Sequence, residues 1–171
     1  MRVTNEIFKK LKKVKLLALD FDGTLTNGKV YVNQYGEETV CCSKKDSLGT
    51  NMLQKAGIQV VVLSKETNPV VKARCKKIRV SCYSGANTGN DKLKILKQFM
   101  LKNGITSKEV VFMGDDVNDL LCLEFAGIAA TVADGNKACK KLAHIITKKS
   151  GGDHAVREVC DLILKAKKLP I

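Results

Sequence analysis

Asp20 and Asp22 follow directly after an apolar stretch, Leu16-Leu-Ala-Leu19, with only Phe21 between the two acids. Ionised carboxylates are expensive to bury unless a positive group lies beside them. An apolar strand that ends on two acids therefore indicates a site where a positive partner is held. This pair is the first candidate for chemistry in the chain.

Three other groups of polar residues occupy comparable places after apolar runs or at the start of a helical pattern. They are Ser64, Lys65 and Glu66 after residues 59–63, Lys92 near the start of the pattern at 91–103, and Asp115, Asp116 and Asp119 after residues 110–113. If the apolar runs are parallel strands, their carboxyl ends meet at one edge of a sheet, where ligands bind. We therefore expect these groups to share one rim.

Asp20, Asp22 and Asp115 cannot share a small site as bare anions. Two unit charges about 4 Å apart repel by about 4 kcal/mol at an effective dielectric constant of about 20. A hard divalent cation removes that repulsion, and oxygen ligands without His or Cys favour Mg²⁺. The acids therefore predict a magnesium site.

The remaining groups at the rim suit a phosphate. The Ser64 hydroxyl and the Lys92 ammonium are donors of the right kind, and we expect the backbone N–H groups of Gly23 and Thr24 to face the same anion. A carboxylate that faces phosphorus can act as a nucleophile. A second acid two residues further on can protonate the leaving alcohol and activate water. The set predicts phosphoryl transfer.

Apolar runs and helical patterns alternate along the chain. The expected strands cover residues 14–21, 59–63, 79–83, 110–113, 128–132 and 144–147, and the expected helices cover 47–56, 68–77, 91–103, 116–126, 136–143 and 155–168. This alternation predicts an α/β fold with a mainly parallel sheet and helices on both faces. Two further β segments at 30–34 and 38–42 flank a turn with Gly36, which predicts a β-hairpin after the first strand.

Composition limits the other possibilities. The 171 residues are 44% hydrophobic, which suits one domain over 1–171 with a core at about 12–168. No apolar run reaches the roughly 18 residues of a membrane span, and residues 1–15 lack a secretory signal pattern. Those residues form either a packed basic helix or an arm. Seven cysteines without a CxxC pair predict free thiols and a cytoplasmic protein.

The net charge of +13 raises the question of a nucleic-acid partner. Aromatic residues make up only 5% of the chain, Trp is absent, and no nucleic-acid motif occurs, so we expect no such partner. A positive field also raises the encounter rate with a small anionic substrate.

The motifs together resemble the haloacid dehalogenase superfamily, whose fold is a Rossmann-like α/β domain. Its first motif stands here as Asp20-Phe-Asp-Gly-Thr24, its second as Ser64, its third as Lys92 and its fourth as Gly114-Asp-Asp-Val-Asn-Asp119. The resemblance implies the following roles: Asp20 as nucleophile, Asp22 as general acid and base, Mg²⁺ held by Asp20, the Asp22 backbone carbonyl and Asp115, phosphate bound by Ser64 and Lys92, and Asp119 orienting the metal shell and Lys92.

Within that superfamily the chain resembles the branch without a large cap that acts on phosphates of 3-deoxy-2-keto sugar acids. Residues 22–28, Lys45-Asp46, Asp91-Lys92 and 150–158 carry this likeness. The branch contains phosphatases of KDO 8-phosphate and of N-acylneuraminate 9-phosphate, and a domain of some CMP-sialic acid synthetases. It implies a homotetramer in which the 30–42 hairpin builds the interface and a neighbour's C-terminal segment closes the site.

Two departures from the branch concern specificity and closure. Lys65-Glu66 stands where the eight-carbon enzymes have Gly-Arg, and Glu66 resembles the nine-carbon, neuraminate-type enzymes. This resemblance slightly favours a nine-carbon substrate. Arg157 matches an Arg of the C-terminal motif, but Asp153-His154 replaces the usual residues before it. Glu66 and Arg157 are therefore weak candidates for substrate recognition.

Several simpler interpretations stay open. Ser64 could be a helix-start hydroxyl, Lys92 a surface lysine, Asp119 a first-turn acid, and Asp116 is expected to be an N-cap. A signalling receiver also forms an aspartyl-phosphate, but the order of the acids and of Lys92 along this chain disagrees with one. A non-catalytic assembly domain of a CMP-sialic acid synthetase is the alternative to the phosphatase.

Overall fold

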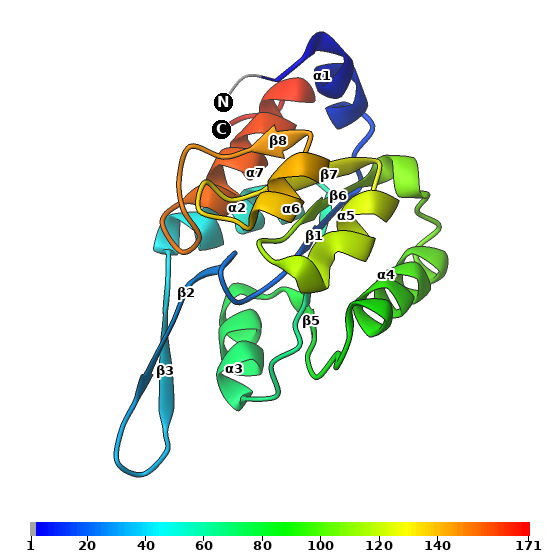
Figure 1. The fold of residues 1–171 in the computed structure, drawn as a ribbon. Coiled ribbons are helices and arrows are strands. Elements are labelled where there is room, and N and C mark those ends of the chain that lie inside the picture. Colours follow the sequence, from blue (N-terminus) through cyan, green and yellow to red (C-terminus); the bar gives the residue numbers. More distant parts are fainter. Residues whose placement is uncertain (1–2) are drawn as a thin grey trace.

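A six-stranded sheet forms the centre of the molecule in the computed structural model, which describes residues 3–171 (Figure 1). The strand order is β5-β4-β1-β6-β7-β8, and every neighbouring pair is parallel. The bounds are β1 Leu16–Leu19, β4 Gln59–Leu63, β5 Ser81–Tyr83, β6 Val110–Met113, β7 Ile128–Thr131 and β8 Ile145–Ile146. The predicted α/β fold is therefore confirmed. Met1 and Arg2, with which the predicted domain and the basic N-terminal segment begin, lie outside the described residues.

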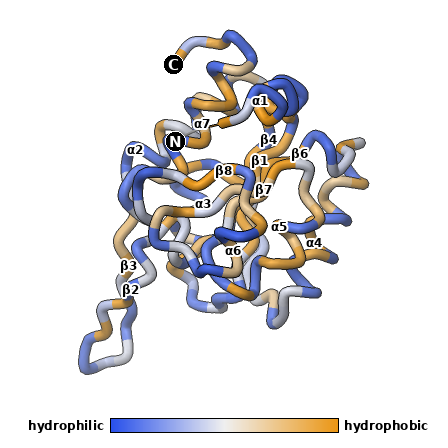
Figure 2. The backbone as a smooth tube through the Cα atoms, turned by 45° about the horizontal axis from the view of Figure 1, so that its top comes forward, coloured by the Kyte–Doolittle hydropathy of each residue, from blue (hydrophilic) through white to orange (hydrophobic). Residues whose placement is uncertain are grey.

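Helices cover both faces of this sheet. The bounds are α1 Asn5–Leu11, α2 Lys44–Lys55, α3 Pro69–Ile78, α4 Gly89–Lys102, α5 Leu120–Phe125, α6 Lys137–Leu142 and α7 Ala155–Ala166, with short 3₁₀ turns η1 Ser107–Glu109 and η2 Val117–Asp119. One apolar cluster joins the sheet to α1, α2, α3 and α7, and another joins it to α4, α5 and α6. Figure 2 shows the hydrophobic colour concentrated in the interior around β1, β6 and β7.

The sequence of β1 explains why it lies at the middle of the molecule. Successive side chains of a strand point to opposite faces of the sheet. Leu17 and Leu19 pack in the first cluster and Leu16 and Ala18 in the second, and all four are fully buried. A strand that is apolar on both faces is stable only between two layers of helices.

Local sequence signals set most of the ends of the helices and strands. Helix α2 begins earlier than predicted because the Ser43 hydroxyl accepts hydrogen bonds from the N–H groups of Lys45 and Asp46. Pro69 occupies the first turn of α3 as expected, and Asn68 caps it. The predicted strand at 79–83 starts only at Ser81, because Arg79 adopts a left-handed conformation (φ 59°) that ends α3.

The predicted helix over 116–126 is divided into two pieces. Asp116 caps the 3₁₀ turn η2, and Asp119 at its third position completes a capping box. Helix α5 then starts at Leu120. The prediction that Asp116 is an N-cap is confirmed, and the bend that it creates brings Asp119 under the sheet edge.

The hairpin follows β1 directly and extends away from the rest of the chain (Figure 1). It consists of β2 Thr26–Val32 and β3 Glu38–Cys42, which pair antiparallel, and Gly36 in its turn has φ 77°. Val32 is 63% exposed and Tyr35 80% exposed. The predicted hairpin insertion is confirmed, and no large cap domain accompanies it in residues 3–171. Among the helices described, none combines the length and the apolar character that a membrane crossing requires.

Candidate active site

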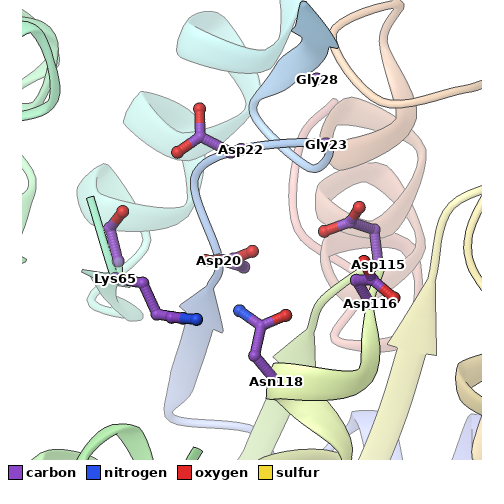
Figure 3. A pocket seen from close by; sticks show the side chains of 9 residues that line it. Asp20, Asp22, Gly23, Gly28, Lys65, Asp115, Asp116 and Asn118 are labelled. Atoms are coloured by element: carbon purple, nitrogen blue, oxygen red, sulfur yellow. The ribbon is translucent and has the colours of Figure 1, made fainter. Parts of the chain in front are cut away.

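The three central strands bring the predicted residues together at their carboxyl ends. Because β1 lies between β4 and β6, Asp20, Ser64 and Asp115 meet at one rim. They line a pocket of about 230 Å³ (Figure 3). Its full lining is Asp20, Asp22, Gly23, Gly28, Ser64, Lys65, Asp115, Asp116 and Asn118. A volume of this size suits a phosphate group more than a whole sugar phosphate.

Lys92 lies beneath this pocket and is fully buried. Helix α4 presents its Nζ at 2.6 Å from Asp20 Oδ1 and at 2.6 Å from Asp119 Oδ1. Burial alone would lower the pKa of Lys92, but the attraction of the two carboxylates outweighs it and raises the pKa. The interpretation of Lys92 as a surface lysine is therefore wrong. The ammonium has three donors, and the two carboxylates account for two of them.

Asp119 is also fully buried, and its two oxygens have different partners. Oδ1 pairs with Lys92, and Oδ2 accepts hydrogen bonds from the N–H groups of Asp115 at 3.0 Å and Asp116 at 3.4 Å. A side chain at Gly114 would overlap the Asp119 carboxylate, so only glycine fits there. Burial raises the pKa of Asp119, with repulsion from Asp20 as the second cause. Asp119 thus positions both the Asp115 backbone and the Lys92 ammonium.

Asp20, Asp115 and Asp119 each offer one carboxylate oxygen within 4.8 Å of the others. Burial raises the pKa of Asp20 to about 6 despite the attraction of Lys92, and burial raises that of Asp115 to about 6. One buried ammonium does not balance this group of acids. The all-oxygen donor set and its negative excess fit a hard divalent cation. Since Asp119 already accepts three hydrogen bonds, Asp20 and Asp115 are the freer ligands.

The Asp22 side chain points away from Asp115 (Figure 3). Asp22 is half-buried, and burial together with the charge of Glu66 raises its pKa. Thr26 Oγ1 donates to its Oδ1 at 3.5 Å. A carboxyl group that keeps its proton at higher pH and faces away from the acid cluster suits proton transfer more than metal ligation through its side chain.

One expectation about the loop after β1 is wrong. The N–H of Gly23 was expected to face a phosphate, but it donates to Thr26 Oγ1 at 3.1 Å. The same oxygen also accepts the N–H of Gly28 at 3.1 Å. The Thr26 hydroxyl therefore links Gly23 and Gly28, at the two ends of this loop, through hydrogen bonds. Gly23 is needed for another reason, because it has φ 73° and a side chain there would overlap the Asp115 carboxylate.

Ser64 is buried and faces the pocket. Its Oγ accepts the N–H of Glu66 at 3.0 Å, which leaves the hydroxyl proton free to donate to a ligand. Since Asn68 is the residue that caps α3, the interpretation of Ser64 as a helix-start hydroxyl is wrong. Glu66 accepts hydrogen bonds from the N–H groups of Thr67 and Asn68 at 2.7 and 2.8 Å, so its carboxylate shapes its own turn.

The structure does not bring Arg157 to the pocket of its own chain. It lies on α7, where Nε contacts Asp161 Oδ1 at 2.6 Å and the side chain packs over Gly49 of α2. Its backbone N–H donates to Asp46 Oδ1 at 2.8 Å. The closure of a neighbour's site by this segment stays a prediction.

Some residues near the site carried no clear signal in the sequence. Lys65 and Asn118 extend toward each other beside Asp20 (Figure 3), yet neither residue type is distinctive by itself. Gly151 and Gly152 pack against the loop after β1, and a side chain at either would overlap the backbone of Gly23 to Asn27. The Gly-Gly pair was a usable signal of close backbone approach.

Comparisons with known proteins agree with this geometry. A family model described as haloacid dehalogenase-like hydrolase matches residues 65–159. The 3-deoxy-D-manno-octulosonate 8-phosphate phosphatase KdsC of Escherichia coli K12 is 31% identical over 165 residues, which cover 96% of this chain and 86% of that protein. The chain belongs to the haloacid dehalogenase-like hydrolase family. Within this family it is a phosphatase, as the relatives and the acidic pocket together indicate.

Two further relatives of this hydrolase are informative. A crystal structure of 3-deoxy-D-manno-octulosonate 8-phosphate phosphatase from Moraxella catarrhalis, in complex with magnesium, phosphate and KDO, is 36% identical with a TM-score of 0.91, and the match covers 96% of this chain and 94% of that one. N-acylneuraminate cytidylyltransferase A of Danio rerio is 34% identical over 158 residues, which cover 91% of this chain but only 36% of that protein.

Proposed function

We propose that this hydrolase is a magnesium-dependent phosphomonoesterase that acts through an aspartyl-phosphate on Asp20. The observation that carries the proposal is the convergence of Asp20, Asp115 and Asp119 around one corner of a pocket, with the buried Lys92 ammonium beneath them. Asp20 and Asp115 would hold Mg²⁺ through their carboxylates, with the Asp22 backbone carbonyl beside them. When bound, the ion would supply charge neutralisation for the phosphate.

The residues of the pocket divide the reaction between them. Asp20 Oδ forms a bond to phosphorus while the bond from phosphorus to the alcohol oxygen breaks, and the Asp22 carboxyl gives its proton to that oxygen. Asp22 then accepts a proton from water as the water attacks phosphorus, which returns Asp20 and releases inorganic phosphate. The Ser64 hydroxyl and Lys92 stabilise the charge on the phosphoryl oxygens. The raised pKa of Asp22 suits both of its proton transfers.

The substrate that we propose is the phosphate of a 3-deoxy-2-keto sugar acid, with KDO 8-phosphate ahead of N-acylneuraminate or KDN 9-phosphate. The names of the phosphatases with which this chain shares 31% and 36% identity support the eight-carbon acid. The argument for a nine-carbon substrate rested on Glu66, whose carboxylate is engaged with the backbone of its own turn. The pocket accommodates the phosphate, so the sugar body would extend beyond it.

The second candidate is a weakly active or non-catalytic assembly domain of a CMP-sialic acid synthetase. It is favoured by the match to N-acylneuraminate cytidylyltransferase A, in which the matched region is a part of a longer protein. Against it, the nucleophile position holds an aspartate, and Lys92 and Asp119 are in contact with each other as a working site requires.

We further propose that residues 1–171 act as one domain within a homotetramer. Two strands alone are marginally stable in water, and here both faces of the hairpin are largely exposed in the single chain. A neighbouring copy that packs on Val30, Val32 and Tyr35 would bury them. The seven free thiols support a cytoplasmic location.

A comparative assay tests the substrate. Phosphate release is measured with Mg²⁺ on KDO 8-phosphate, N-acetylneuraminate 9-phosphate and its deaminated analogue. We expect the highest kcat/KM on KDO 8-phosphate. A preference for either nine-carbon substrate would reject the order proposed here, and an absence of hydrolysis on all three and on p-nitrophenyl phosphate would favour the assembly domain.

A further inference from the structure

Lys65 is the only cation among the nine residues that line the active-site pocket, and four of the other eight are acids. Lys92 is not among the nine; it is fully buried, and its ammonium is engaged by two carboxylates. Lys65, by contrast, is exposed and forms no ion pair within residues 3–171. The pocket therefore has one unengaged ammonium, to which the reaction described above gives no role.

The turn that carries Lys65 is held to the end of β5 and to the segment that follows it. The N–H of Ser64 donates to the Tyr83 carbonyl at 2.9 Å, and the N–H of Gly85 donates to the Glu66 carbonyl at 3.1 Å. Both neighbours of Lys65 in the chain are therefore fixed through their backbones. Only the side-chain torsions of Lys65 remain to be ordered when a ligand binds, which keeps the entropic cost of the contact low.

The side chain of Lys65 lies on one particular side of the proposed nucleophile. Figure 3 shows Lys65 and Asp115 on opposite sides of Asp20, and Lys65 extends past Asp20 toward Asn118. The corner that suits a divalent cation is the one that Asp20 shares with Asp115. A phosphoryl group bound at Asp20 has three non-bridging oxygens, so it can face this corner with one oxygen and Lys65 with another.

The size of the pocket favours a contact of Lys65 with the phosphoryl group over one with the carboxylate of a sugar acid. The pocket measures about 230 Å³, and the body of a sugar would extend beyond it. Lys65 directly follows Ser64, whose hydroxyl proton is free to donate to the same group. An ammonium is a compact point charge on a flexible stem, which suits a phosphoryl oxygen.

We propose that Lys65 binds a non-bridging oxygen of the substrate's phosphoryl group, on the side of Asp20 that faces away from Asp115. This inference rests on the phosphatase function proposed above. As the bond from phosphorus to the alcohol oxygen breaks, negative charge is spread over the non-bridging oxygens, and the ammonium stabilises it. The substrate displaces water from the pocket, so the attraction is stronger in the complex than at the exposed side chain. Lys65 forms no covalent bond and transfers no proton.

Two substrates separate a contact with the phosphoryl group from a contact with the sugar acid. p-Nitrophenyl phosphate and KDO 8-phosphate share the phosphoryl group but not the carboxylate. With Mg²⁺, Lys65→Met should lower kcat/KM by about 10- to 100-fold, and by a similar factor on both substrates. Lys65→Arg keeps the charge and should retain more activity than Lys65→Met. The matched control is Lys102→Met, which removes the same charge from an exposed lysine outside the pocket and should change kcat/KM by less than about twofold.

Three outcomes of this assay would overturn the proposal. A loss on KDO 8-phosphate without a loss on p-nitrophenyl phosphate would assign Lys65 to the sugar carboxylate instead. Wild-type kcat/KM of Lys65→Met on both substrates would show that Lys65 touches neither group. An equal loss in Lys102→Met would show an effect of net charge alone. Urea denaturation of Lys65→Met should match the wild type, because Lys65 is exposed and unpaired, so the variants are compared as folded proteins.

Calorimetric titration with inorganic phosphate in the presence of Mg²⁺ measures the same contact without turnover. We expect the Kd for phosphate to rise by about tenfold in Lys65→Met and to stay unchanged in Lys102→Met. If the wild type binds phosphate but hydrolyses neither substrate, the phosphatase proposal fails, and a rise in Kd would still support the contact with Lys65. If the wild type hydrolyses both substrates and Lys65→Met matches it in both measurements, only the inference about Lys65 fails. A wild type that neither binds phosphate nor hydrolyses a substrate would reject both.

Discussion

The active-site pocket and the basic groove between α2 and α3, which is lined by Lys44, Lys55, Arg74, Lys77 and Arg79 and by no acid, both concentrate charge of one sign, but they do so under opposite conditions. In the pocket, Asp20 and Asp119 are almost fully buried, and one buried ammonium lies between them. In the groove, Lys44, Lys55 and Lys77 are exposed to water and have no ion pair within residues 3–171.

Whether an excess of like charge is buried or exposed determines its effect on the protein. Water screens the groove cations, so their mutual repulsion costs little free energy. Their combined positive field mainly attracts anions from solution. The acids of the pocket lack that screening, so their pKa values rise to about 6 at Asp20 and Asp115. A buried excess therefore needs a bound cation, whereas an exposed one can stay unbalanced.

The largest effect is expected for Asp20→Asn. It removes the nucleophile, and we expect kcat/KM on p-nitrophenyl phosphate with Mg²⁺ to fall by about 10³-fold or more. Without metal and above about pH 6, the variant should unfold at a higher urea concentration than the wild type, because one buried negative charge is gone. The control is Glu124→Gln, an exposed acid that takes part in none of the ion pairs of residues 3–171, and it should change neither value. Residual turnover within tenfold of wild type would rule out Asp20 as nucleophile.

Lys92→Met tests how much the buried ammonium stabilises the pocket. The change leaves Asp20 and Asp119 buried without their cation, so we expect the free energy of unfolding to fall by about 3–5 kcal/mol. Lys102→Met, at an exposed position of the same helix, should change it by less than about 0.5 kcal/mol. Equal effects of the two changes in urea denaturation would show that burial makes no difference to a lysine here.

Asp46 extends the comparison to a buried acid without a cation. It is 1% exposed, its Oδ1 accepts the Arg157 N–H, and its Oδ2 has no partner among the described residues. Burial raises its pKa from 3.8 to about 6. The folded state then holds the proton more tightly than the unfolded chain, so this group's contribution to stability is lost as pH rises from about 4 to about 6.

Asp46→Asn should remove that loss. The free energy of unfolding of the variant minus that of the wild type should increase by up to about 3 kcal/mol between pH 4 and pH 6, and stay level above pH 6. Urea denaturation across this range measures it, and the difference cancels the titration of Asp20 and Asp115. A difference that does not change with pH would mean that Asp46 titrates normally in the folded protein.

The smallest effect is expected in the groove. Lys55→Gln/Lys77→Gln should change the free energy of unfolding by no more than about 0.5 kcal/mol, because both cations are exposed. A slight gain in the free energy of unfolding at low salt that vanishes at high salt would show that the two lysines only repel each other, unlike Lys92. A loss above about 1 kcal/mol would show that these lysines stabilise the fold, as Lys92 does. Lys102→Gln/Lys108→Gln provides the matched control.

Much of the site was predictable because its residues stand at fixed places relative to strands. The apolar runs at 59–63 and 110–113 match β4 and β6, and the acids and Ser64 follow from their ends. The partners of Lys92, by contrast, could not be predicted from the sequence. Asp20 and Asp119 are 72 and 27 positions away from it along the chain, and only packing shows that its side chain is buried between them.

Other features were missed because their signals are common in any sequence. Thr26 looks like an ordinary strand residue, yet its hydroxyl accepts the Gly23 N–H that was expected to face phosphate, together with the Gly28 N–H. The basic groove arises from lysines and arginines on two helices whose relative placement no pattern in either helix specifies.

The sequence by itself determined the alternation of strands and helices, the hairpin, and the set of acids, hydroxyl and lysine that the family shares. These depend on local periodicity and on residue type. The tertiary structure decided which carboxylates lie near one another, which of them are buried, and where the unpaired cations gather. Electrostatic energy depends on distance and on exposure to water, and both are fixed only when segments far apart in the chain pack together.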